Sequence, residues 1–223
     1  MSGLPRGTLT RELLVRESLR LLDKDGVAGF SLPKLGRALG ADPTAVYRHF
    51  RNKREMLSEL ANRLFATEPE LDPASPWQER LRAWVWHAMR RYRNHLDLGL
   101  LLAGQTDELP SLVRIRERSL GLLTEAGLSL KQAALFSQVL ENHVVGCGLF
   151  FAVSGWHSCP PHESLEATRR FYTMLPADIA PLTREAAPHL CPEPDDVYAY
   201  TTDLLIAAIE RIAATEGEEV ARA

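Results

Sequence analysis

A short stretch within the first quarter of the chain carries side chains that suit contact with the edges of DNA bases and with phosphates. Thr44 and Ala45 are small, so the Thr44 hydroxyl can donate to or accept from a base edge or a phosphate, and the Ala45 methyl can contact a thymine methyl. The Arg48 guanidinium can bind a guanine edge or a phosphate through two parallel hydrogen bonds. Tyr47 and His49 are stiff side chains with one polar tip, and they suit contact with the nucleic-acid backbone.

Two short helices are predicted to hold these side chains. The first runs from about Leu32 to Leu39, with leucines on one face, Ser31 as its N-cap and Gly40 at its end. Asp42 is predicted to cap the second, whose first position is Pro43. Helix, glycine-containing turn and helix form the helix-turn-helix pattern, in which the second helix enters a DNA major groove about 12 Å wide.

Apolar residues are predicted to anchor this unit from the inside. Val46 and Phe50 lie on the side of the second short helix opposite its polar residues, so we expect both to be buried. A helix from about Thr10 to Lys24, ended by Gly26, precedes the pair, and another from Lys53 to about Ala66 follows it. The four helices together predict a small DNA-binding head.

Flanking residues extend the predicted DNA contacts. Lys53 follows Asn52, the predicted N-cap of the fourth helix, where the lysine charge and the free backbone amides favour the same phosphate. Arg6 or Arg11 can add a contact if the N-terminal arm reaches across the groove. The residues predicted to contact DNA are Ser31, Lys34, Pro43, Thr44, Ala45, Tyr47, Arg48, His49 and Lys53.

Charge is unevenly distributed along the chain. The 223 residues are 45% apolar and 25% charged, which suits one or two globular domains and excludes collagen-like or low-complexity chains. The first 66 residues hold 12 basic and 7 acidic side chains, a net charge of +5, whereas the remainder carries −8. A basic N-terminal part on an acidic body suggests an anionic polymer as the partner at one end.

Four segments of the N-terminal part fix aromatic, basic and glycine positions close together: residues 30–35 (FSLPKL), 39–41 (LGA), 45–50 (AVYRHF) and 53–57 (KREML). They closely resemble the DNA-binding head of the tetracycline-repressor (TetR) family. With lower specificity, Trp77-Gln78, Ser129-Leu130 and Gly146-Cys147 resemble that family's C-terminal domain, whereas the insert from Trp156 to Pro194 does not align. The resemblance implies a homodimer of all-α subunits, each with a reading head and an effector cavity.

The rest of the chain is also predicted to be helical. Prolines 69, 73 and 76 mark a hinge, so we divide the chain into a DNA-binding domain, residues 1–66, and an effector-binding and dimerisation domain, residues 67–223. Helical segments are predicted at about 77–95, 98–103, 110–125, 131–154, 165–175, 179–187 and 195–215. No alternating strand pattern of useful length is present, so the predicted fold class is all-α.

Two helical segments carry more apolar surface than one core needs. Residues 144–153 and 204–209 are apolar all round, and a helix that is apolar on every face is buried on every face. We therefore expect a two-fold dimer whose interface is a four-helix bundle of helices 131–154 and 195–215 from each subunit. Such a dimer predicts a pseudo-palindromic DNA operator.

Aromatic and amide side chains of the second domain suggest the lining of a small-molecule pocket. The residues predicted to bind the effector are Leu64, Trp84, Ala88, Leu102, Gln105, Phe136, Gln138, Asn142, His143 and Phe151. Core packing is the alternative for each of them, and His143 suits a hydrogen-bonded core histidine. The family's namesakes bind a tetracycline–magnesium complex partly with histidines, and the nearest counterpart of one here is Leu102, so an apolar or aromatic effector is expected.

Other function classes have weaker signals. His143, Cys147, His157, Cys159 and His162 match no standard zinc spacing, so no metal site is predicted. Without a nucleophile elbow or a glycine-rich phosphate loop, we expect neither an enzyme nor a cofactor. A helical small-molecule-binding or partner-binding protein that does not touch DNA is the alternative. No signal peptide or membrane-spanning run is found, so a cytoplasmic location is expected.

Overall fold

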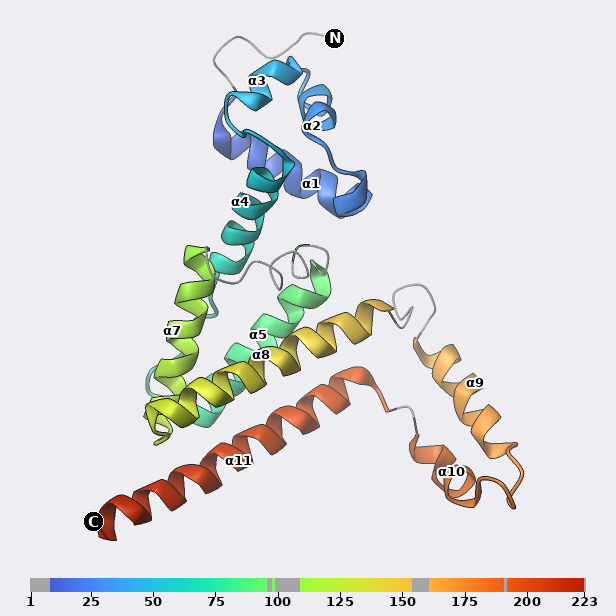
Figure 1. Ribbon diagram of the computed structural model, residues 1–223. Coiled ribbons are helices and arrows are strands. Elements are labelled where there is room, and N and C mark those ends of the chain that lie inside the picture. Colours follow the sequence, from blue (N-terminus) through green and yellow to red (C-terminus); the bar gives the residue numbers. More distant parts are fainter. Residues whose placement is uncertain (1–8, 96–97, 99–108, 154–160, 191, 223) are drawn as a thin grey trace. The chain divides into compact units, whose positions relative to one another are not determined.

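The structure is a computed structural model that describes residues 9–95, 98, 109–153, 161–190 and 192–222 (Figure 1). Side chains are described in these ranges except at positions 23, 149, 151–153, 161–164 and 217–222. Every regular element in this part of the chain is a helix, which confirms the predicted all-α class. None of the described helices is long and apolar enough to cross a lipid bilayer.

The first four helices follow the predicted order. They are α1 (Arg11–Gly29), α2 (Leu32–Ala38), α3 (Pro43–Tyr47) and α4 (Lys53–Ala66). Gly26 interrupts α1 with φ at 65°, which confirms the predicted stop, and one further turn continues to Gly29.

The predicted N-caps are confirmed by hydrogen bonds from backbone amides. The Ser31 side chain accepts from the Lys34 amide, and Asp42 accepts from the amide of Thr44. Asn52 accepts from the Glu55 amide at 2.8 Å. These caps satisfy amides that have no partner inside their own helices, so each helix start is fixed by local sequence.

A single apolar cluster supports the four helices. It joins buried leucines of α1 and α2 to Val46, Phe50, Met56 and Leu60, all of them fully buried. α1 packs against α2 and α4, and α2 packs against α3. The prediction that Val46 and Phe50 point inward is therefore confirmed.

The remaining helices are α5 (Trp77–Asn94), α7 (Pro110–Glu125), α8 (Leu130–Val153), α9 (Pro161–Thr173), α10 (Pro181–Ala186), the short 3-10 helix η1 (Ala187–His189) and α11 (Pro194–Arg222). α11 is longer than predicted and continues past Thr215 to Arg222. The helix predicted at 98–103 lies outside the described residues, except for Leu98.

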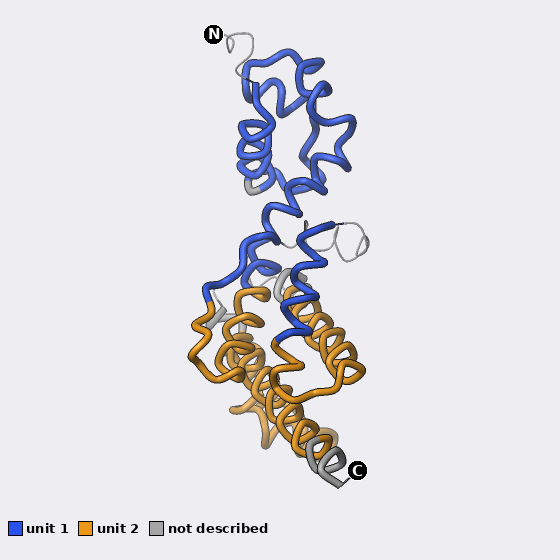
Figure 2. Tube along the Cα trace, turned by 90° about the vertical axis from the view of Figure 1, so that its left-hand side faces the viewer, with its two compact units in different colours: residues 1–70, 90–121 blue, residues 71–89, 122–223 orange. Residues whose placement is uncertain are grey.

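The chain divides into two compact units (Figure 2). The first contains residues 1–70 and 90–121, and the second contains residues 71–89 and 122–223. α5 and α7 therefore each begin in one unit and end in the other. The predicted domain division at residue 66 stays a prediction.

In the second unit, α5, α8 and α11 share a core. Tyr198 of α11 is fully buried, and its hydroxyl donates to the Val85 carbonyl of α5 at 2.9 Å. The Tyr198 ring meets Trp86 edge-on and stacks on His143 of α8 at 4.5 Å between ring centroids. Arg82 and Asp203 add an ion pair between α5 and α11 at 2.7 Å.

Candidate DNA-binding surface and effector region

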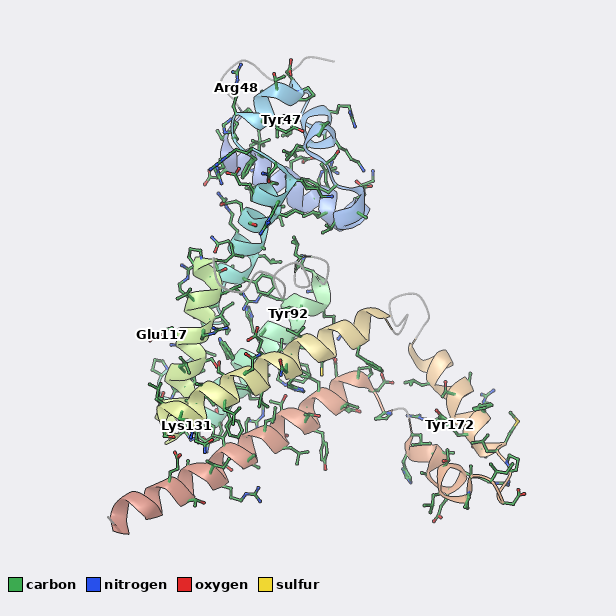
Figure 3. The ribbon with its side chains drawn as sticks, viewed as in Figure 1. Tyr47, Arg48, Tyr92, Glu117, Lys131 and Tyr172 are labelled. Atoms are coloured by element: carbon green, nitrogen blue, oxygen red, sulfur yellow. The ribbon has the colours of Figure 1, made fainter. Side chains whose placement is uncertain are left out.

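α3 presents its polar side chains to solvent. Its inner side chain, Val46, is fully buried, whereas Tyr47 is 47% exposed and Thr44 and Arg48 are exposed. Figure 3 shows Tyr47 and Arg48 at α3, at the end of the head remote from the C-terminal end of α4. Of the other predicted contacts on this segment, Pro43 is exposed, and Ala45 and His49 are partly exposed. The structure thus brings the predicted residues of α3 together on one exposed surface.

At the start of α3, hydrogen bonds between Asp42 and Thr44 determine which groups are left to contact DNA. Asp42 Oδ1 accepts from the Thr44 amide and from Thr44 Oγ1, each at 2.7 Å. These hydrogen bonds, the one from the hydroxyl foremost, lower the pKa of Asp42 and keep it ionised. Because the hydroxyl hydrogen of Thr44 is used by Asp42, Oγ1 can offer only an acceptor to DNA, which suits an adenine or cytosine amino group.

Two lysines predicted to contact DNA are engaged within the head. Lys53 Nζ donates to the Val27 carbonyl at 2.5 Å, and Lys34 Nζ donates to the Gly29 carbonyl at 3.1 Å. Lys34 also pairs with Asp25 at 3.0 Å. Both lysines therefore fasten the turn that follows the Gly26 break, a role that their sequence positions did not reveal.

Gly36 is a residue that the sequence interpretation did not single out. A Cβ at this position would lie 3.3 Å from the Pro43 Cα and 3.4 Å from the Ala41 carbonyl oxygen. Only glycine leaves room for α2 and α3 to approach this closely without displacing the backbone. The sequence feature that could have indicated this role is the position of Gly36, one residue after Leu35 on the leucine-bearing side of α2.

The predicted effector residues fall into distinct environments. Trp84 is 6% exposed on α5, and no described residue accepts a hydrogen bond from its Nε1. Phe136 is buried on α8, Ala88 on α5 is partly exposed, and Leu64 on α4 packs partly buried against the head core. Three further predictions, Leu102, Gln105 and the side chain of Phe151, lie outside what the structure describes.

Gln138 and Asn142 lie on a different side of α8 from Phe136. Both are exposed, and Gln138 Nε2 donates to Asn142 Oδ1 at 3.1 Å. Leu135 and Phe150 of the same helix are 60% and 63% exposed. The structure therefore does not bring these two amides together with the buried aromatic residue, because they point to another face of the helix.

His143 is engaged at both ring nitrogens. Thr202 Oγ1 donates its single hydrogen to the Tyr198 carbonyl at 2.7 Å, so it must accept from His143 Nε2, 3.3 Å away. Nδ1 is then unprotonated and accepts from the Cys147 thiol at 3.6 Å. Burial lowers the pKa of His143 and raises that of Cys147, so both are neutral. This arrangement matches the core-histidine alternative.

The described residues contain no group of three or more metal-ligating side chains. His157 and Cys159 lie outside the described residues, as does the side chain of His162.

Comparison with known proteins identifies the family. The model of bacterial regulatory proteins of the tetR family matches residues 14–60, and that of the tetracyclin repressor-like C-terminal domain matches residues 68–190. The HTH-type transcriptional repressor Rv1353c of Mycobacterium tuberculosis is 28% identical over 150 residues, which cover 63% of this chain and 57% of that repressor. The class E tetracycline repressor protein of Escherichia coli is 26% identical over 144 residues, 63% of this chain and 68% of that protein.

Solved structures show the same fold. The TetR-type regulator SCO7222 of Streptomyces coelicolor has a TM-score of 0.78 at 22% identity, covering 92% of this chain and 99% of that one. ActR of the same organism, in complex with actinorhodin, has a TM-score of 0.77 at 22% identity, covering 93% and 99%. The family consists of transcriptional regulators, which agrees with the prediction that the chain is not an enzyme. With both family models matched in order along most of its length, the chain belongs to the tetracycline-repressor (TetR) family.

Proposed function

We propose that this protein is a cytoplasmic transcriptional repressor that binds a pseudo-palindromic DNA operator as a homodimer and is released by a small apolar or aromatic effector. The observation that carries the proposal is α3, whose Thr44, Tyr47 and Arg48 face solvent while Val46 is fully buried in the head. A helix whose inner face is packed against the head and whose outer face is polar is suited to the major groove. The relatives named as repressors support the same function.

The dimer is supported by apolar side chains on the second unit. Phe150 of α8 is 63% exposed, and Tyr200 and Leu204 of α11 are 68% and 53% exposed. Exposed apolar side chains on two adjacent long helices are typical of an interface between subunits. A second copy, related by a two-fold axis, would bury them in a four-helix bundle.

An effector is supported by the environment of Trp84. Its indole N–H is buried, and burying a donor without an acceptor costs about 1–3 kcal/mol. A bound aromatic molecule with an acceptor oxygen would satisfy this donor and pack against the ring. The solved complex of ActR with actinorhodin shows that a structurally similar protein binds a small molecule.

The route from effector to DNA is proposed to pass through α4. The Arg91 guanidinium, on the last turn of α5, donates to the Leu64 and Thr67 carbonyls at the C-terminal end of α4. Asn62 of α4 accepts from the Ser111 amide of α7 at 3.0 Å. Because α5 and α7 continue into the second unit, an effector that moves either helix also moves α4 and changes the spacing of the two heads.

The proposal is tested by DNA titration. A duplex selected from a randomised library on the wild-type protein is titrated at several salt concentrations, beside a duplex of scrambled sequence. We expect affinity to fall steeply with salt, and Arg48→Ala to weaken the selected duplex far more than the scrambled one. The matched control is Arg20→Ala, which removes an exposed arginine of α1. A flat salt response would instead favour the helical binding protein that does not touch DNA.

A further inference from the structure

A single arginine links three helices of the head. Arg11, the first residue of α1, donates from Nη1 to the His49 carbonyl at 3.0 Å, just beyond the end of α3. Its Nη2 donates to Glu59 of α4 at 3.4 Å and lies 4.0 Å from Glu55. The guanidinium carbon also lies 4.2 Å from the centroid of the buried Phe50 ring. The sequence analysis allowed Arg11 to reach across the groove, whereas in the structure both terminal nitrogens of its guanidinium are paired with groups of the head.

α3 depends on contacts of this kind. It spans only five residues, too few for a helix to be stable in isolation, so tertiary contacts must fix its direction. Val46 and Phe50 anchor its inner side. Arg11 anchors the backbone just beyond its C-terminal end, at the His49 carbonyl.

The α4 side of the link is a charged carboxylate. Glu59 is shared between Arg11 and Arg63, whose Nε donates to it at 2.8 Å. Burial raises the pKa of Glu59, but the Arg63 hydrogen bond and the charges of both arginines outweigh it, so the net pKa is lowered and the group stays ionised. Arg11 therefore connects α3 to a fixed negative charge on the helix that runs out of the head.

We propose that Arg11 is a positioning residue for operator recognition: it holds the C-terminal end of α3 at a set direction relative to α4 and does not neutralise a phosphate. The inference rests on the proposed DNA-binding function. Its consequence is that Arg11 determines affinity for the specific sequence, where α3 must align with base edges, and contributes little to non-specific binding, which depends on the side chains that contact phosphates directly.

Three variants separate positioning from phosphate contact. Arg11→Lys keeps the charge but cannot reach the carbonyl and carboxylate together while covering the ring. Arg11→Gln removes the charge, and Glu59→Gln leaves Arg11 in place but weakens its anchor on α4. Arg20→Lys and Arg63→Gln are the matched controls, because the first changes an arginine paired elsewhere on α1 and the second removes the other partner of Glu59.

Each variant is titrated with the duplex selected on the wild-type protein and with its scrambled counterpart, at several salt concentrations, after thermal unfolding confirms a folded protein. We expect each of the three variants to weaken the selected duplex about tenfold, since a hydrogen bond to a charged group contributes that much free energy. Affinity for the scrambled duplex and its salt slope should not change, and the controls should bind like wild type.

A phosphate contact predicts the reverse pattern. Arg11→Lys would then restore binding, Arg11→Gln would weaken both duplexes and reduce the salt slope by about 0.9, and Glu59→Gln would bind as well as wild type or better. Any of these results overturns the positioning role. If the wild-type protein itself selects no sequence and shows no salt dependence, the proposed function fails instead, so the two failures are distinct.

Discussion

At the scale of single residues, buried and half-buried polar side chains of the second unit affect its stability and the dependence of that stability on pH. The Cys147 thiol, the His143 imidazole and the Thr202 hydroxyl form one hydrogen-bonded chain that ends on the Tyr198 carbonyl. Each donor in this hydrogen-bonded series has an acceptor while the imidazole and the thiol are neutral. Protonating His143, or removing the Thr202 hydroxyl, breaks these hydrogen bonds. Two predictions follow from this.

The first prediction concerns pH. Burial lowers the pKa of His143 below its ordinary value of about 6.5. The unfolded chain therefore takes up the proton first, and the free energy of unfolding falls as pH drops below about 6.5. In His143→Gln, whose amide can still donate to Thr202, this contribution is absent. Chemical denaturation between about pH 7.5 and pH 5 should show a shallower loss of stability in the variant. Equal slopes in both proteins would contradict the assignment.

The second prediction contrasts two buried hydroxyls. Ser119 Oγ of α7 is buried without a partner among the described residues, whereas Thr202 is satisfied on both sides. Ser119→Ala should raise the free energy of unfolding by about 1 kcal/mol, because it removes an unsatisfied group and adds a better helix former. Thr202→Val should lower it by about 1–3 kcal/mol, because it leaves the His143 N–H unpaired. Thermal unfolding measures both changes. A loss of stability in Ser119→Ala would contradict the prediction that its hydroxyl is an unsatisfied buried group.

At the scale of the element, local signals in the sequence were sufficient for most helix boundaries in the head. Ser31, Asp42 and Asn52 were predicted as caps and act as caps, because a cap depends only on residues two or three positions away. The lysine tethers were not predictable, because Lys53 bonds a carbonyl 26 residues away. The same limit applies to Gly36, whose role depends on how closely α2 and α3 pack.

This packing gives the third prediction. Gly36→Ala places a methyl group 3.3–3.4 Å from the Pro43 Cα at the start of α3, from the Ala41 carbonyl oxygen and from the Val46 side chain. Overpacking against backbone should outweigh the helix-propensity gain of about 1 kcal/mol, so stability and affinity for the selected duplex should both fall. Gly121→Ala in α7 is the control, because a methyl group added there would meet no atom within 4 Å and the change should stabilise. Urea denaturation of the two variants checks the opposite signs.

At the scale of the whole molecule, the sequence predicted the fold class and the helix order but not which helix faces meet. α8 was predicted as a dimer helix because residues 144–153 are apolar all round, and its amides Gln138 and Asn142 were predicted to line the pocket. In the structure its faces differ: Phe136 and Leu140 are buried, whereas Leu135 and Phe150 face outward with Gln138 and Asn142. Periodicity does not distinguish these faces when both are apolar, so only tertiary contacts assign them.

The outward face of α8 and α11 gives the fourth prediction. If this face is the subunit interface, Phe150→Glu and Leu204→Glu each place a carboxylate where an apolar side chain would be buried, which costs several kcal/mol per site. Because the two changes recur on both subunits, each should yield a monomer in sedimentation velocity at concentrations where the wild-type protein is a dimer. Val113→Glu is the control, since Val113 is 61% exposed on α7, close to the 63% of Phe150. It should stay dimeric.

The monomeric variants also connect assembly to DNA binding. A single head contacts only one half-site, so Phe150→Glu and Leu204→Glu should lose most of their affinity for the pseudo-palindromic duplex while keeping wild-type affinity for an isolated half-site. Such a split would place the defect in assembly, because the heads are unchanged. Dimers that survive both substitutions would mean that the exposed apolar face of α8 and α11 has another partner.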